Sequence, residues 1–364
     1  MGVLSVFGYF PRYRVESRMR ILVTGGAGYI GSHACLRLLQ DGHFVVAIDN
    51  LHRGHQAPMD MLGSVYPESF RFVHSDLGDT KIVLDTINTH SLDTVLHFGA
   101  LAYVSESVEQ PLMYYKNNIA SGIGLLDACD QAHNGAGISR FIFSSSCATF
   151  GDPPDDMIPV PEHCPQTPTS PYGSTKLQME QILIDYAKKR ELDNNPIALT
   201  ILRYFNVAGA DTSGMLGEDH SPETHLIPVA INAALGRRTA MTIFGTDYPT
   251  PDGTNIRDYV HIDDLIDAHV LAMNTISVGQ CEAFNIGIGK GYSVREVLEA
   301  VRRVSGVDFP IKDAPRRAGD AVALFCNSQK ARTVLGWEPR YTDIDAIVST
   351  AYSWMLSHPD GYSD

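Results

Sequence analysis

The sequence comprises 364 residues with a formal net charge of −14 and 44% hydrophobic residues, and its mean hydropathy is −0.07. Such a charge argues against general binding to nucleic acid or anionic membranes, and no apolar run approaches the ~18 residues of a membrane span. The six cysteines have no C-x-x-C spacing, which predicts free thiols in a reducing compartment, and therefore a cytoplasmic protein with no metal site.

Residues 1–18 precede the first predicted strand and are expected to form an N-terminal extension. An unstructured tail, or translation from a start upstream of Met19, is favoured over a weak targeting segment. Residues 19–206 are then predicted to form a dinucleotide-binding domain of the Rossmann type, and residues 207–364 a smaller α/β region that binds substrate.

A short apolar strand at residues 21–23 ends in a glycine-rich loop, T-G-G-A-G-Y-I-G. Gly25, Gly28 and Gly31 suit a tight turn, close approach of the backbone to a pyrophosphate, and close packing of helix on strand. A helix that begins near Tyr29 and Ile30 directs its free N–H groups at the phosphates.

The next strand, residues 44–48, ends at Asp49, about 20 residues beyond the glycine loop, where a carboxylate accepts hydrogen bonds from an adenosine ribose. Asn50 and Leu51 follow, with no adjacent arginine to meet a 2′-phosphate. This pattern favours NAD over NADP as the cofactor.

Apolar runs continue at residues 70–73, 94–98, 141–143 and 199–202, and amphipathic segments lie between strands at 33–40, 81–89 and 177–190. Buried strands that alternate with helices predict an α/β fold with a doubly wound parallel sheet. Ligands bind beyond the carboxyl ends of such strands. These ends carry candidate dinucleotide-binding residues, namely Asp76, Leu77, Phe98, Gly99, Ala100, Ser144 and Tyr204.

After Asn206 the composition changes, and residues 208–228 are predicted to form a long loop that opens the second region. A helix is expected at 229–235 and turns at 237–253. Residues 255–260 then lead back toward the sheet, so that 255–288 are expected to rejoin the dinucleotide-binding domain. Two further helices are predicted at 293–305 and 344–356, with a basic loop, 315–320, between them.

Tyr172 and Lys176 begin a helix after Pro171, and their spacing of four places the phenol and the ammonium on one face. Use of a tyrosine as a base near pH 7 requires its pKa to fall by about 3, or about 4 kcal/mol. One cation at ~4 Å supplies about 4 kcal/mol at an effective dielectric of 20, so Lys176 and the positive nicotinamide ring together suffice. Ser146 is predicted to hydrogen-bond the substrate hydroxyl whose proton Tyr172 removes.

The motifs T-G-G-A-G-Y-I-G-S-H, S-S-S-C-A-T-F-G, S-P-Y-G-S-T-K and L-R-Y-F-N resemble those of the extended short-chain dehydrogenase/reductases. T-D-Y-P-T-P-D-G-T and R-R-A-G-D are similar to the UDP-glucose (UDP-galactose) 4-epimerase group, and the resemblance runs from Met19 almost to Asp364. It implies a UDP-sugar substrate, a homodimer, and retained NAD. Tyr172 would deprotonate the 4-hydroxyl as NAD⁺ takes the C4 hydride. The 4-keto sugar would then rotate to present its other face before the hydride returns.

The resemblance also implies that Asn117 contacts the cofactor. For the UDP-sugar it implies Asn206, His225, Leu226, Phe244, Arg257, Arg317, Asp320 and Leu324, in addition to Ser146 and Tyr172.

This chain departs from the group's pattern at three positions: Ala102 replaces a frequent lysine, His225 replaces an asparagine, and Leu324 replaces a tyrosine or cysteine linked to N-acetylated sugars. UDP-N-acetylhexosamine and UDP-xylose/UDP-arabinose 4-epimerases therefore stay open as alternatives. A 4,6-dehydratase is disfavoured because Ala148 to Gly151 offer no carboxylate, and a non-catalytic NAD sensor because Tyr172 and Lys176 are both retained.

Overall fold

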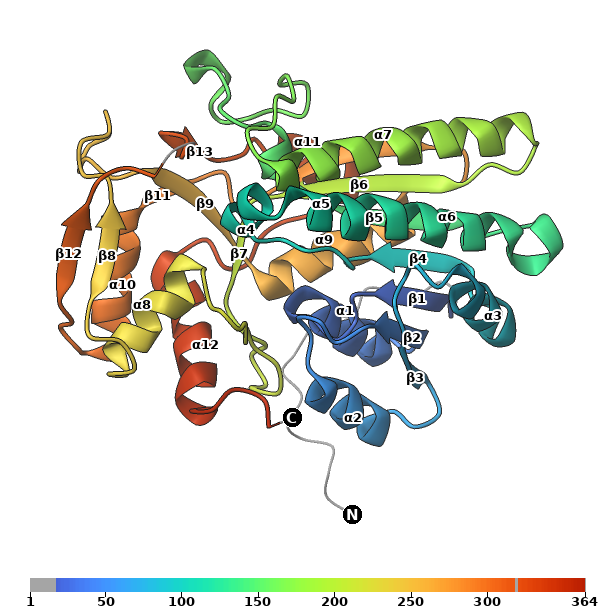
Figure 1. Cartoon of the computed structure of the whole chain (residues 1–364), viewed down its shortest axis with the longest axis horizontal. Helices are drawn as coiled ribbons and strands as arrows, with labels where there is room; N and C mark the ends of the chain where they lie inside the picture. The colour runs from blue at the N-terminus through green and yellow to red at the C-terminus, as the bar shows by residue number, and fades with distance from the viewer. Residues whose placement is uncertain (1–17, 318–319, 364) are drawn as a thin grey trace.

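The computed structural model describes residues 18–317 and 320–363 (Figure 1). Nearly all of the predicted N-terminal extension, together with Ala318 and Gly319 of the basic loop, lies outside the described residues.

A seven-stranded parallel sheet forms the larger half of the molecule, with strand order β10-β6-β5-β4-β1-β2-β3. This order confirms the predicted Rossmann-like, doubly wound architecture. Its strands are β1 (Arg20–Thr24), β2 (Phe44–Asp49), β3 (Phe70–His74), β4 (Thr94–His97), β5 (Arg140–Ser146), β6 (Ala198–Tyr204) and β10 (Cys281–Ile286).

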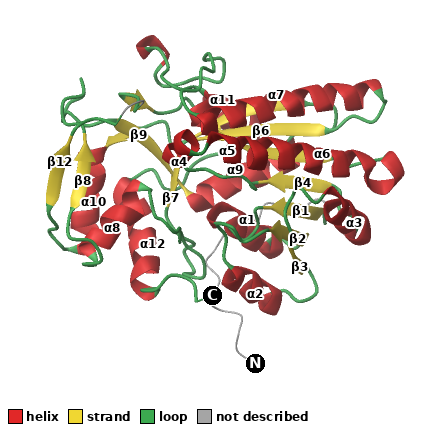
Figure 2. Ribbon diagram, in the orientation of Figure 1, coloured by secondary structure: helices red, strands yellow, loops and turns green. Residues whose placement is uncertain are grey.

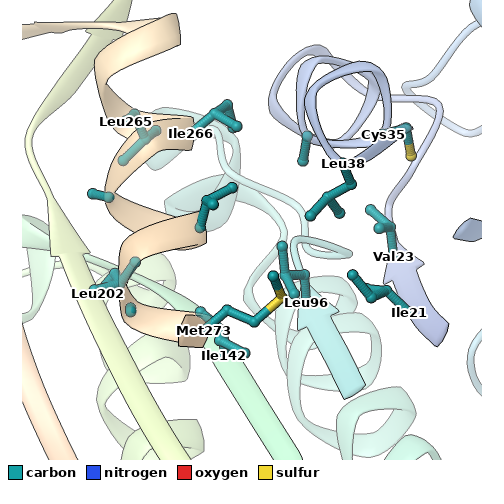
Figure 3. Close-up of a cluster of buried hydrophobic side chains, with 14 of the residues drawn as sticks. Ile21, Val23, Cys35, Leu38, Leu96, Ile142, Leu202, Leu265, Ile266 and Met273 are labelled. Atoms are coloured by element: carbon teal, nitrogen blue, oxygen red, sulfur yellow. The ribbon is translucent and has the colours of Figure 1, made fainter. Parts of the chain in front are cut away.

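Helices cover both faces of this sheet because successive side chains of each strand point to opposite sides. Ile21 and Val23 of β1 pack against α1 and α9, whereas Leu22 packs in the opposite layer. Figure 3 shows α1 and α9 side by side over β1, β4, β5 and β6. One layer contains α1 (Tyr29–Gln40), α2 (Gln56–Val65), α9 (Ile262–Thr275) and α11 (Gln329–Leu335), and the other contains α3 (Thr80–His90), α6 (Ser121–Gln131) and α7 (Pro171–Leu192).

The connection from β4 to α6 contains α4 (Val104–Glu109), α5 (Pro111–Tyr114) and a π-helical turn, Tyr115–Ala120. Asn118 in that turn fixes the segment, since its side chain bonds both backbone groups of Leu101 and the hydroxyl of Thr175 at 2.9–3.0 Å. The segment after β4 is thereby held against α7.

The smaller region has its own sheet, in which β9 (Ile256–His261) pairs with β7 (Asn206–Ala208), β11 (Gly291–Ser293) and β13 (Ala323–Leu324). A separate pair joins β8 (Met241–Phe244) to β12 (Ile311–Ala314). Helices α8 (Leu226–Ala234), α10 (Val294–Ser305) and α12 (Ile344–Ser357) complete a second core. Figure 2 shows this mixed region beside the large sheet.

Two segments differ from the sequence expectations. The stretch expected to hold turns, 237–253, contains β8, and residues 256–261 form a strand of the smaller sheet. The chain joins the seven-stranded sheet again only with α9 and β10. No helix among the described residues has the length and apolar character needed to span a membrane.

Candidate active site

A cavity of about 500 Å³ lies at the carboxyl ends of the parallel strands and extends to the smaller region. The residues predicted to bind the dinucleotide that line it are Gly25, Gly28, Tyr29, Ile30, Gly31, Asp49, Asn50, Asp76, Leu77, Phe98, Gly99, Ala100, Asn117, Tyr172, Lys176 and Tyr204. The lining residues predicted to bind substrate are Ser146, Tyr172, Asn206, His225, Leu226, Arg257, Asp320 and Leu324.

Each of the three glycines of the first loop has a different structural role. Gly25 has a φ of +66°, and a Cβ at this position would lie 2.7 Å from the backbone of Gly99. A Cβ at Gly31 would lie 2.0 Å from the carbonyl oxygen of Gly25, so only glycine allows α1 to pack this closely on the loop. Gly28 is different, because a Cβ there would approach only the Gly25 oxygen, at 3.4 Å. Because Gly28 has no side chain, it leaves the start of α1 open to the cavity. The first N–H groups of a helix lack partners within the helix.

Asp49 lies at the end of β2 and is oriented by the backbone. Its Oδ2 accepts the N–H of Ala27 at 3.0 Å, and its Oδ1 accepts the N–H of Leu51 at 2.8 Å. Burial raises the pKa of this carboxyl, and the two N–H donors oppose that effect. Asn50 donates to Oδ2 of Asp76 at 2.8 Å, which links the ends of β2 and β3 at the cavity edge.

Tyr172 is in the first turn of α7. Ser170 caps this helix by accepting the N–H of Gly173 at 3.2 Å, and Pro171 occupies the first turn. A Cβ at Gly173 would lie 2.4 Å from the carbonyl oxygen of Ala148. Glycine therefore lets the helix approach the end of β5, where Tyr172 meets Ser146.

Burial dominates the ionisation of this pair. It raises the pKa of Tyr172 to about 12, although a hydrogen bond with Ser146 acts in the opposite direction. It also lowers the pKa of Lys176 to about 7, opposed by the carboxylate of Glu180. The Lys176 ammonium donates to the carbonyl oxygen of Ser144 at 2.7 Å and lies 5.9 Å from the centre of the Tyr172 ring.

A buried ion pair beneath the cavity was not predicted. Glu180 is 2% exposed, its Oε2 accepts from Arg203 at 2.7 Å, and its Oε1 accepts the hydroxyl of Ser145. The pair joins α7 to the ends of β5 and β6, and so positions the strand that carries Ser146. Glu180 lies four residues after Lys176, and this helical spacing was the available sequence signal.

The wall toward the smaller region combines polar and apolar side chains. Nη2 of Arg257 lies 3.9 Å from Oδ1 of Asp320. Leu324 pairs with Arg257 across β13 and β9, is 8% exposed, and packs with Cys147 and Phe205.

Three predicted site residues do not line the cavity. Ser144 is fully buried behind it, where its hydroxyl lies 3.0 Å from Nε2 of His269. Arg317 and Phe244 are exposed and contact each other, with the guanidinium carbon 4.2 Å from the ring centre. A binding role for these three residues therefore requires a contact that this cavity does not provide.

The model of the NAD dependent epimerase/dehydratase family matches residues 21–287. A UDP-glucose 4-epimerase of Lactobacillus helveticus is 45% identical over 347 residues, which cover 95% of this chain and 100% of that protein. UDP-arabinose 4-epimerase 1 of Arabidopsis thaliana is 42% identical over 348 residues, covering 94% of this chain and 80% of that protein.

Solved structures agree with these matches. The crystal structure of a UDP-glucose-4-epimerase from Stenotrophomonas maltophila, with bound NAD and formylated UDP-arabinopyranose, has a TM-score of 0.87 and 36% identity to this chain. The similarity covers 95% of this chain and 100% of that one.

Proposed function

The chain belongs to the NAD dependent epimerase/dehydratase family, and we propose that it interconverts UDP-glucose and UDP-galactose by inverting C4 of the sugar. The observation that carries this function is a single cavity lined both by a dinucleotide-binding glycine loop and by Tyr172, Lys176 and Ser146. The 45% identity to a UDP-glucose 4-epimerase over nearly the whole chain supports the choice of substrate.

The residues present fit NAD. Gly28 leaves the start of α1 open to the cavity, and Asp49 has two oriented carboxylate oxygens at the end of β2. The first N–H groups of α1 would hold the pyrophosphate, and Asp49 would hold the adenosine ribose. When bound, NAD supplies an acceptor for the C4 hydride and later returns it, so the reaction has no net redox change.

Tyr172 is assigned the role of removing and returning the proton of the sugar's 4-hydroxyl. It takes this proton as the sugar is oxidised to the 4-keto form and gives it back when C4 is reduced from the other face. Ser146 bonds the same oxygen and keeps it within reach of the phenol. Lys176, held by the Ser144 carbonyl, places a positive charge that stabilises the phenolate.

The polar residues of the opposite wall are assigned to the UDP-sugar. Arg257 offers a planar fork of donors to phosphate oxygens, and Asp320 and Asn206 line the cavity beside it. The keto sugar must rotate so that either face of C4 meets the cofactor, and the apolar surface of Leu324 offers it no hydrogen bond.

The activity is tested by incubating the purified protein with UDP-galactose and no added coenzyme. UDP-glucose should accumulate until the two sugars reach equilibrium. Failure to convert any UDP-sugar would overturn the proposal.

A pentose substrate is a second candidate, favoured by the 42% identity to a UDP-arabinose 4-epimerase. UDP-arabinose and UDP-N-acetylgalactosamine are therefore run in parallel with UDP-galactose. A kcat/KM for UDP-arabinose at least tenfold above that for UDP-galactose would assign the pentose reaction to this chain.

The protein is further proposed to be a cytoplasmic homodimer that associates through the helices within residues 112–129 and 177–190. Leu112 and Ile123 support this surface, since they are 82% and 42% exposed. The six free cysteines fit a reducing compartment. Sedimentation should give twice the 39.9 kDa chain mass, and Ile123→Asp should reduce it to one chain. A wild-type monomer would contradict the dimer.

A further inference from the structure

The loop between β7 and α8 brings two imidazoles and two carboxylates to one point. Glu218, His220, Glu223 and His225 each offer one ligand atom, and these four atoms lie within 4.8 Å of one another. The four residues come from a stretch of only eight residues.

Both histidines present Nδ1 to the same carboxylates. Nδ1 of His220 lies 3.2 Å from Oε1 of Glu218 and 3.7 Å from Oε2 of Glu223. Nδ1 of His225 contacts Oε1 of Glu218 and lies 3.8 Å from Oε1 of Glu223. Nδ1 of His220 is buried and forms no hydrogen bond of good geometry with these oxygens. The nitrogen therefore faces the cluster without a well-made partner.

The charges of the cluster are confined to its own members. Within the described chain, the ion pairs of Glu218 and Glu223 are all with His220 and His225. The nearby guanidinium of Arg53 is engaged elsewhere, with Glu106 and the carbonyl oxygen of Ser221. The side chain of Glu218 is 6% exposed and that of Glu223 is 14% exposed, so two shielded carboxylates share their positive partners.

We propose that Glu218, His220, Glu223 and His225 bind one divalent transition-metal ion of the zinc class. Four nitrogen and oxygen ligands suit the tetrahedral site that Zn²⁺ prefers, with metal–ligand distances of about 2.0–2.2 Å. At those distances the ligand atoms of a tetrahedron lie about 3.3–3.6 Å apart. Three of the nitrogen–oxygen separations in the cluster, at 3.2, 3.7 and 3.8 Å, are close to this value. The lack of C-x-x-C motifs argues only against a thiolate site.

The proposed ion would lie in the wall of the active-site cavity. His220 and His225 line that cavity, and His225 is the N-cap of α8. A bound ion would therefore tie the loop to the start of α8, next to Leu226. The ion would share His225 with the predicted substrate-binding residues. It takes no part in the proposed hydride and proton transfers, so its binding can fail while the proposed function stands.

The test uses the protein with its nucleotide, first dialysed against EDTA and then titrated with Co²⁺. Tetrahedral Co²⁺ has strong visible absorption bands that the hydrated octahedral ion lacks. We expect these bands to saturate at one Co²⁺ per chain and to disappear when Zn²⁺ is added. His220→Gln and Glu223→Gln should each weaken Co²⁺ binding at least tenfold, whereas His163→Gln, at an exposed histidine, should leave it unchanged.

Circular dichroism identifies any variant that fails to fold. For that case, X-ray absorption of the wild-type cobalt protein must show imidazole and carboxylate ligands and no sulfur. The proposal is overturned if the wild type gives no tetrahedral bands, if both folded variants bind Co²⁺ as tightly as the wild type, or if sulfur ligates the ion.

Discussion

Tyr172 and Lys176 illustrate what burial does to the proposed catalytic pair. Their spacing on α7 is as expected, yet burial raises the pKa of the phenol to about 12 and lowers that of the ammonium to about 7. Both changes oppose the phenolate–ammonium form that a base near neutral pH requires. Positive charge beside Tyr172 must therefore offset its burial, and Lys176 and the nicotinamide ring are the assigned sources.

At this residue scale, Tyr172→Phe should lower kcat by at least 100-fold, because proton transfer by a positioned group contributes about 10²–10⁴. The ring and its packing remain, so KM and bound NAD should change little. Tyr352→Phe on α12, away from the cavity lining, is the matched control. Steady-state kinetics at saturating UDP-galactose measure the effect, and a variant with wild-type kcat would remove Tyr172 from the mechanism.

Leu324 should limit the size of the sugar that the cavity accepts. Its side chain is 8% exposed and lies on the cavity wall, so Leu324→Ala enlarges the cavity at this point. We expect the ratio of kcat/KM for UDP-N-acetylgalactosamine to that for UDP-galactose to rise at least tenfold.

Val322→Ala provides the comparison, because Val322 is near β13 but does not line the cavity. Equal ratios in the wild type and in Leu324→Ala would show that this side chain does not select the sugar.

At the scale of elements, the glycine loop, α1 and β2 together form the proposed dinucleotide-binding site. Gly25 supplies the positive φ, Gly31 allows the helix to pack on the loop, and Gly28 leaves the start of α1 open to the cavity. The N–H of Gly25 and that of Gly26 both bond the carbonyl oxygen of Ile48, which ties the loop to the strand that ends in Asp49.

This arrangement predicts different effects for two glycine substitutions in the loop. Gly31→Ala places a Cβ 2.0 Å from a backbone oxygen, so α1 must shift, and both the unfolding temperature and NAD retention should fall. Gly28→Ala meets only a contact of 3.4 Å, so it should fold normally and lose NAD affinity alone.

Gly63→Ala is the control for both, because Gly63 lies in α2 and its nearest neighbour is 3.9 Å away. Thermal unfolding and the NAD content of the purified proteins distinguish the variants. A Gly31→Ala protein with wild-type stability and full NAD would contradict this account of the loop.

At the scale of the whole molecule, the local patterns predicted the sheet well. Strands β1 to β6 each overlap a predicted apolar run. Strands buried on both faces are continuously hydrophobic, and only β3 among these six is an edge strand, with exposed Arg71 and His74. Strand β10 is an edge strand with an exposed first residue, and its pattern is weaker. Strand β8 is four residues long and pairs only with β12, so nothing local distinguished it from a turn.

The site was predictable where its chemistry is local in sequence. The glycine loop connects two consecutive elements, β1 and α1, and Tyr172 and Lys176 lie on one helix, α7. The cavity lining contains residues of both motifs. The Glu180–Arg203 pair joins side chains 23 residues apart on different elements, and that contact requires the tertiary fold. Ser144 fails as a lining residue because it lies two residues before the carboxyl end of β5, where its side chain is fully buried against His269.

The junction of the two regions predicts a pH-dependent stability. Asp263 in α9 is 7% exposed, and burial, with Asp211 beside it, raises its pKa to about 8. The folded protein thus keeps a proton that the unfolded chain releases near pH 3.9. The stability that this proton provides is present at low pH and is lost as the pH rises through 8.

Asp263→Asn should therefore remove this dependence. Between pH 5 and 8 the wild type should lose up to about 1.4 kcal/mol per pH unit more than the variant. Thermal unfolding across this range measures the difference, with the exposed carboxyl of Asp360 replaced in the control, Asp360→Asn. Parallel profiles for the wild type and Asp263→Asn would contradict the assignment.

The central claim is that one cavity removes hydrogen from C4 of a UDP-sugar and returns it to the same carbon. UDP-galactose labelled with deuterium at C4 tests it most directly when it is incubated with the enzyme in ordinary water. The account predicts that the UDP-glucose formed keeps its deuterium at C4. Replacement of that deuterium by hydrogen from the solvent would contradict it.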